Sequence, residues 1–152
     1  MKNFIFLSSL FFTLFVRQGF AQQPGIRFEK GNWKAALAQS GHQHQLIFLE
    51  VSTSWCVPCR LMASEVFSQK VTGDFFNLHF INYAIDAEKG EGRIIAGQYP
   101  IEYYPTYLFI NSHGKLIFKD HGFCNGDQLI SMGEKAISIW KLSDQTDVGN
   151  KK

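Results

Sequence analysis

The most informative stretch of the chain is Leu46-Ile47-Phe48-Leu49-Glu50-Val51-Ser52-Thr53-Ser54-Trp55-Cys56-Val57-Pro58-Cys59, which joins an apolar run to a pair of cysteines. The apolar run predicts a strand over 46–52 that is buried on both faces. The residues after the cysteines have helical spacing, which predicts a helix over 58–69. Pro58 would lie in its first turn, where a missing N–H costs little. The two thiols therefore lie where a strand is followed by a helix.

This placement predicts redox chemistry at the two cysteines. A helix N-terminus stabilises negative charge, so Cys56 should ionise more easily there, and the thiolate is the reactive species in disulfide exchange. The alternatives are half of a zinc site or a purely structural disulfide. A zinc site needs about four ligands, and the sequence holds no second CxxC and no paired histidine motif. We therefore expect a redox-active Cys56–Cys59 disulfide, with no metal and no other cofactor.

The N-terminal residues have the pattern of a secretory signal peptide. Lys2 precedes an almost wholly apolar run over 4–16, and Gly19-Phe20-Ala21 places small residues where a signal peptidase cleaves. We expect residues 1–21 to be removed and the protein to be exported, into a bacterial periplasm. The alternative is an uncleaved membrane anchor, but the apolar run has 13 residues before Arg17, fewer than the roughly 20 that span a bilayer.

The rest of the chain is long enough for one domain with its own core, which we place at residues 22–143. Residues 144–152 are expected to form a flexible polar tail. Without residues 1–21, which contain two basic residues, 13 basic and 13 acidic residues remain. This balance gives no electrostatic reason to expect a nucleic acid or an anionic membrane as partner. No stable membrane insertion is expected after cleavage of the signal peptide.

Hydrophobic periodicity predicts the order β-α-β-α-β-α-β-β-α, which is an α/β fold with a mixed central sheet and helices on both faces. The expected strands are 26–28, 46–52, 80–85, 106–110 and 115–120. The expected helices are 32–40, 58–69 with helical spacing that continues over 71–78, 91–99 and 126–140. Gly41 is expected to cap the first helix, and residues 111–114 to form a hairpin turn.

Taken in order, these motifs make the chain resemble the thioredoxin family over about residues 30–142. The resemblance is carried by Trp55-Cys56-Val57-Pro58-Cys59, by Asp86 at a strand end, by Tyr104-Pro105-Thr106 and by Gly122 before the last helix. It implies a thioredoxin fold. The Val57-Pro58 pair and the stretch 88–92 are most similar to extracytoplasmic members, including domains of membrane-linked electron-transfer reductases.

The resemblance also implies roles for individual residues. Cys56 would be the exposed nucleophile, and the less exposed Cys59 would resolve the mixed disulfide. Pro105 would be a cis-proline that faces the thiols, unless it is an ordinary proline at a strand start.

Glu50 occupies the place of a buried aspartate of the family, six residues before Cys56. It would accept the proton of Cys59. The alternatives for Glu50 are an outward-facing strand residue or a buried acid with a salt-bridge partner. The chain departs from the family here, because the acid is one methylene longer and Asn82 stands where a lysine neighbour is usual.

The resemblance further implies a groove for client polypeptides, bordered by Trp55, Val57, Pro58, Tyr104, Pro105, Gly122 and Phe123. Core packing is the alternative for the aromatic members, above all for Phe123. Asp86 is expected to cap the segment after its strand. Cys124 is expected to be a semi-buried core thiol, with a regulatory thiol or an intermolecular bridge as alternatives.

The predicted function is that of an exported thiol–disulfide oxidoreductase, which reduces disulfides of extracytoplasmic protein clients. A membrane or soluble thiol electron donor would regenerate the reduced pair. The alternatives are a disulfide oxidase or isomerase of the same fold, and a non-catalytic thioredoxin-fold binding module.

Overall fold

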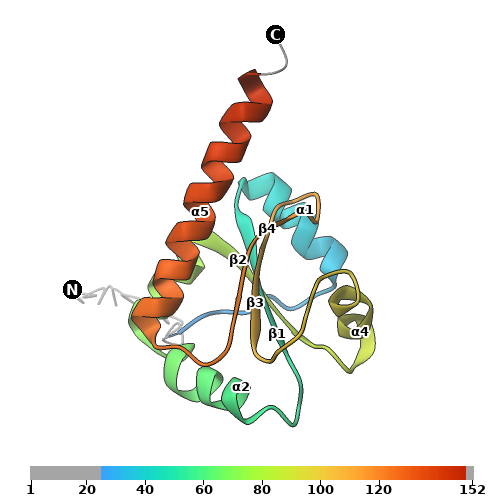
Figure 1. The fold of residues 1–152 in the computed structure, drawn as a ribbon, viewed down its shortest axis with the longest axis vertical. Helices are drawn as coiled ribbons and strands as arrows, with labels where there is room; N and C mark the ends of the chain where they lie inside the picture. The colour runs from blue at the N-terminus through green and yellow to red at the C-terminus, as the bar shows by residue number, and fades with distance from the viewer. Residues whose placement is uncertain (1–24, 150–152) are drawn as a thin grey trace, which may run out of the picture.

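The computed structural model describes residues 25–149, with side chains described as far as Ser143. The predicted signal peptide and its cleavage site lie outside the described residues. The elements, drawn in Figure 1, are α1 (Trp33–Gln43), β1 (Leu46–Ser52), α2 (Val57–Leu61), the π-helical turn η1 (Met62–Val66), α3 (Lys70–His79), β2 (Phe80–Asp86), α4 (Gly90–Ala96), β3 (Thr106–Ile110), β4 (Leu116–His121) and α5 (Gly126–Gly149). None of the helices in this described part is long and apolar enough to cross a membrane.

The strands form one mixed sheet in the order β2-β1-β3-β4. β1 pairs in parallel with β2 and antiparallel with β3, and β3 pairs antiparallel with β4 across the predicted hairpin. β1 is therefore a central strand, as its continuous apolar run predicts. Its C-terminal end leads directly to the two cysteines.

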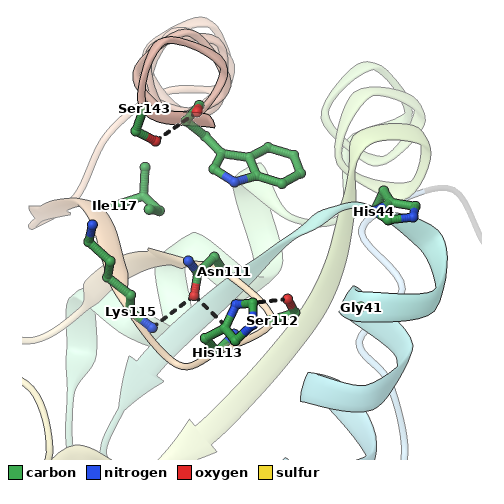
Figure 2. Close-up of a pocket in the computed structure, with 9 residues that line it drawn as sticks. Gly41, His44, Asn111, Ser112, His113, Lys115, Ile117 and Ser143 are labelled. Carbon is green, nitrogen blue, oxygen red and sulfur yellow. Dashed lines mark hydrogen bonds between the residues drawn. The ribbon is translucent and has the colours of Figure 1, made fainter. Parts of the chain in front are cut away.

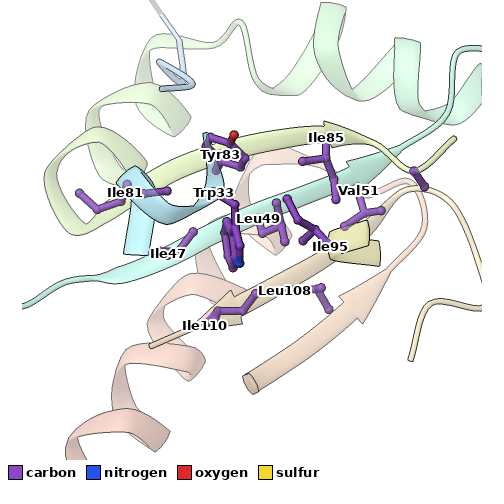
Figure 3. Packing of buried hydrophobic residues seen from close by; sticks show 12 residues of the cluster. Trp33, Ile47, Leu49, Val51, Ile81, Tyr83, Ile85, Ile95, Leu108 and Ile110 are labelled. Atoms are coloured by element: carbon purple, nitrogen blue, oxygen red, sulfur yellow. The ribbon is translucent and has the colours of Figure 1, made fainter. Parts of the chain in front are cut away.

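Side chains alternate along β1 and supply two separate apolar clusters, one on each face of the sheet. Ile47, Leu49 and Val51 pack with α1 and α4 (Figure 3). Leu46 and Phe48 pack on the other face with α3, η1 and α5. By the same alternation Glu50 lies on this second face, which is the face that η1 and α3 cover.

The predicted first strand at 26–28 is wrong, because this segment forms no strand. It runs beside β2 with one backbone bond to that strand, from the N–H of Glu29 to the carbonyl of Asn82 at 2.8 Å. The N–H of Ile26 instead donates to Phe67, at 2.7 Å. A single bond to β2 does not make a ladder, so the observed order begins with α1.

Several helix boundaries also differ from the prediction, among them the end of α4 at Ala96 and not at residue 99. Gly41 does not cap α1: the helix continues to Gln43 and ends at His44, which adopts a left-handed conformation with φ 50°. The predicted helix 58–69 is a short α-helix followed by the π-helical turn. Helix α5 continues to Gly149, beyond its predicted end at residue 140 and into the predicted polar tail.

Candidate active site

Cys56 and Cys59 form a disulfide at the N-terminus of α2. Cys56 is the N-cap residue, and its Sγ accepts a hydrogen bond of 3.1 Å from the backbone N–H of Cys59. Pro58 lies in the first turn, as its missing N–H favours. The first sulfur therefore faces the free N–H groups of the helix, a position that stabilises a thiolate once the disulfide is reduced.

Both sulfur-bearing residues are buried, and the expectation that Cys56 is exposed is wrong for this disulfide form. Cys56 is 3% exposed and Cys59 is 6% exposed. The bond draws the two sulfurs against each other, and the Cys59 N–H covers the first one. The neighbours Trp55 and Val57 are instead exposed, at 61% and 55%.

The indole of Trp55 is held from two sides. Its Nε1–H donates to both carboxylate oxygens of Glu88, at 3.1 and 3.0 Å, and its ring meets that of Tyr104 edge-on at 5.8 Å. Asp86 caps this loop as predicted, because its Oδ1 accepts the N–H of Glu88 at 3.0 Å. A hydrogen bond from Lys89 is the main cause that lowers the pKa of Asp86. Sequence reasoning had not assigned Glu88 to the site.

Pro105 and Gly122 lie together beside this turn. The Tyr104–Pro105 peptide bond is cis, and the carbonyl of Pro105 accepts the N–H of Gly122 at 2.8 Å. Gly122 has φ 90°, a conformation that favours glycine. Its own carbonyl accepts the hydroxyl of Tyr107 at 3.0 Å. These bonds tie the segment before β3 to the segment after β4.

The exposed side of the site carries more aromatic surface than the sequence predicted. Phe123 is 52% exposed, so it is not a core residue. Tyr103 is 58% exposed and stacks on His121 with ring centroids 4.8 Å apart. Neither Tyr103 nor His121 was predicted here; the only sequence signal was that Tyr103 precedes the Tyr104-Pro105 pair. Exposed aromatic rings of this kind suit contact with apolar peptide segments.

Glu50 lies behind the disulfide and is 5% exposed. It lines a cavity of about 320 Å³ together with Cys59 and Thr53, whose buried hydroxyl has no partner among the described residues. Burial raises the pKa of Glu50 to about 7, the hydroxyl of Ser52 lowers it in part, and the charge of Asp86 adds to the rise. A carboxyl that titrates near neutral pH and shares a cavity with Cys59 is suited to exchange a proton with that thiol.

The register of the sheet corrects the neighbour expected for Glu50. Its partner on β2 is Ala84, whereas Asn82 pairs with Phe48. The amide of Asn82 donates to the carbonyl of Arg27 at 3.3 Å and to Asn77 at 3.2 Å. No ion pair among the described residues includes Glu50, which excludes the salt-bridged alternative for that part of the chain.

Cys124 is buried, as its core interpretation predicts. It is 6% exposed, and its N–H donates to the sulfur of Met62 at 3.4 Å. Burial raises the pKa of its thiol to about 11, although a hydrogen bond with Tyr107 lowers it in part. A regulatory or intermolecular role would need access and a thiolate, and this environment disfavours both.

Comparison with known proteins identifies the family of this site. A family model described as a thioredoxin-like domain matches residues 33–137, which include both cysteines, Glu50 and Pro105. The chain belongs to the thioredoxin-like family. The fold is the thioredoxin fold of disulfide oxidoreductases, and it carries the Cys56–Cys59 disulfide pair.

Individual relatives agree with this assignment. The chain is 34% identical to a proposed disulphide-isomerase from Bacteroides thetaiotaomicron, with a TM-score of 0.67, over 77% of this chain and 97% of that one. It shares the fold of the DsbH oxidoreductase, with a TM-score of 0.64 and 20% identity over 76% of this chain and 88% of that one. Thioredoxin H5 from Arabidopsis thaliana is 28% identical over 78 residues, which span 51% of this chain and 61% of that protein.

Proposed function

We propose that this protein is an exported reductase of protein disulfides. The observation that carries the proposal is the position of the Cys56–Cys59 pair between exposed aromatic side chains and the buried carboxyl of Glu50. The exposed rings would hold an apolar client segment, and the carboxylate of Glu50 would accept the proton of Cys59. Residues 1–21 support export, because they have the pattern of a cleaved signal peptide.

In the first step the thiolate of Cys56 attacks one sulfur of a client disulfide. A bond forms between Cys56 and the client, and the other client sulfur leaves as a thiolate. Trp55 and Tyr104 would border the client segment on one side and Phe123 on the other. In the disulfide form the backbone N–H of Cys59 donates to the Cys56 sulfur. In the reduced protein the same N–H would stabilise the Cys56 thiolate before it attacks.

In the second step Cys59 attacks the Cys56 sulfur of the mixed disulfide. Its proton passes to the carboxylate of Glu50, directly or through water in the cavity that both residues line. The Cys56–Cys59 disulfide forms, and the second client sulfur leaves as a thiolate. The client gains two electrons, and a thiol electron donor, membrane-bound or soluble, must reduce the pair again.

The direction of transfer is a matter of redox potential, and we propose reduction. The Val57-Pro58 dipeptide within a thioredoxin-like frame supports it. We expect the Cys56–Cys59 pair to have a reduction potential of about −270 mV, as in thioredoxin, and not the roughly −120 mV of a strong oxidant. Equilibration of the Cys56–Cys59 pair with glutathione buffers measures it. A potential near −120 mV would favour the oxidase, and one near −180 mV the isomerase.

Insulin reduction separates the reductase from a non-catalytic binding module. We expect turnover with dithiothreitol as electron donor, and its loss in Cys56→Ser. Cys124→Ser is the matched control, since it removes the third thiol and leaves the pair intact. Cys59→Ser should trap mixed disulfides with clients through Cys56, and Cys56→Ser should trap far fewer. Wild-type protein without turnover would support the binding module, and the reverse trapping pattern would exchange the roles of the two thiols.

A further inference from the structure

A second cavity, drawn in Figure 2, lies beside the start of β1, whereas the two cysteines follow the other end of that strand. Its volume is about 620 Å³, and it is bounded by the end of α1, the β3–β4 hairpin and α5. β1 begins beside it at Leu46 and ends beside the active site at Ser52, a separation of roughly 20 Å along a strand of this length. The volume lies within the range of small-molecule sites, about 300–1,000 Å³.

Two residues that line this cavity, one in α1 and one at its C-cap, are unfavourable for the helix itself. Gly41 lies inside the helix, where glycine is destabilising. His44 ends the helix in the left-handed conformation, where glycine is the favoured residue. Helix stability would favour a non-glycine residue at position 41 and a glycine at position 44, and the chain has the reverse. Choices that oppose local stability are expected at functional sites.

The position of Gly41 explains how the cavity stays open. A Cβ atom at residue 41 would lie 3.5 Å from the Cβ of Ser112 on the hairpin across from it. Any longer side chain would enter the space between α1 and the hairpin. Glycine at 41 therefore preserves the cavity, and His44 contributes an imidazole to its wall.

The lining combines a lysine and two histidines with an apolar wall. Lys115, His44 and His113 line the cavity, and no Asp or Glu occurs among its described lining residues. Ile117 and Trp140 supply the apolar part. The hairpin itself is held rigid, because the Oδ1 of Asn111 accepts the N–H groups of His113 and Lys115, both at 3.0 Å (Figure 2).

We propose that this cavity binds a small organic anion. Its carboxylate or phosphate group would lie by the ammonium group of Lys115, because charge-assisted hydrogen bonds are the strong ones. Its planar apolar part would lie against Trp140 and Ile117. A cation would be repelled, and a bare inorganic anion would leave the apolar wall without a contact. The site is separate from the disulfide, so binding does not depend on the redox reaction.

The test is an NMR titration of the oxidised protein with 2-naphthoate. We expect shifts of the His113 and Lys115 amides and of the Trp140 indole N–H, with the Trp55 and Tyr104 amides unchanged. The neutral 2-naphthamide and inorganic phosphate should each bind at least about tenfold more weakly, since a hydrogen bond to a charged group or an apolar contact is lost.

Variants locate the binding. Gly41→Leu should abolish it by filling the cavity, while insulin reduction stays at the wild-type rate because leucine favours the helix. Lys115→Gln should weaken it about tenfold, and Lys70→Gln on α3 should not change it. The proposal is overturned if the shifts appear at Trp55 and Tyr104, if naphthamide or phosphate binds as tightly as naphthoate, or if Gly41→Leu and Lys115→Gln bind like wild type.

Discussion

The hydroxyl of Ser52 donates a hydrogen bond of 3.1 Å to the carboxylate of Glu50, two residues earlier on β1. Residues two apart on a strand point to the same face of the sheet, so the Ser52 hydroxyl can reach the Glu50 carboxylate on that face. The bond favours the charged form of Glu50, whereas burial and the nearby Asp86 favour the neutral form. Burial is the larger effect, and the pKa lies near 7. Glu50 therefore changes charge in the pH range where the protein is expected to work.

Glu50→Gln should make stability less dependent on pH. A carboxyl with a pKa of about 7 when folded and 4.5 when unfolded loses stability as the pH rises between these two values. The variant should match wild type near pH 4 and be more stable by roughly 3 kcal/mol above pH 8. Denaturant unfolding at both pH values measures this, with the exposed Glu65→Gln as control. An equal difference at both pH values would mean that Glu50 does not titrate near 7.

The same variant should slow the second chemical step. Without the carboxylate, Cys59 loses its base, and its attack on the mixed disulfide at pH 8 should slow by about 10²-fold. Attack by Cys56 on the client should change much less. Stopped-flow measurement separates the two steps when a model mixed disulfide is preformed on Cys56. Equal resolution rates in the two proteins would leave Glu50 with a structural role alone.

Ala84→Lys should lower the pKa of Glu50. Ala84 is exposed and pairs with Glu50 across β1 and β2, so an ammonium there can approach the carboxylate. An opposite charge within about 4–6 Å lowers a carboxyl pKa by roughly 1–3 units. The carboxyl carbon of Glu50, followed by NMR against pH, reports the midpoint. Ala84→Met is the control of similar length without charge, and identical midpoints in the two variants would contradict an electrostatic effect.

Glu88→Ala should release Trp55 and weaken client binding. The indole is bonded to both oxygens of Glu88 but is itself exposed, so the expected rise in KM for a client peptide is modest, about two- to fivefold. Trp55→Ala should have a larger effect, about tenfold, because the aromatic contact itself is lost. Steady-state kinetics measures both, with Glu134→Ala on α5 as control. A KM unchanged in Trp55→Ala would place the client elsewhere.

Cys124 should be inert in the native protein. With a pKa near 11 it is almost wholly a neutral thiol at pH 8, so Ellman's reagent should react with it more than about 10²-fold more slowly than with a free cysteine of pKa about 8.5. Unfolding should restore the ordinary rate. Rapid reaction of the native, oxidised protein would instead support the regulatory interpretation of this thiol.

The sequence predicted the parts of the active site that follow from short-range patterns. The apolar run before Trp55 predicts β1, and the CxxC spacing after it places both sulfurs at a helix start. The place of Glu50 within this apolar run predicts a buried carboxyl behind Cys59. These relationships lie within about a dozen neighbouring residues, so spacing and periodicity determine them.

The tertiary structure decided what depends on contacts between distant segments. Whether Ala84 or Asn82 faces Glu50 is a question of register between two strands, which the composition of neither strand specifies. The partner of Trp55 is Glu88, 33 residues away, and only the folded loop brings them together. Gly41 was predicted to cap the helix, yet α1, which packs against β1 and β2, continues to Gln43 and leaves this glycine lining a cavity. Local sequence determines where an element begins and what chemistry it carries, whereas burial against other elements determines which groups meet, because the free energy of packing exceeds the local preferences that it overrides.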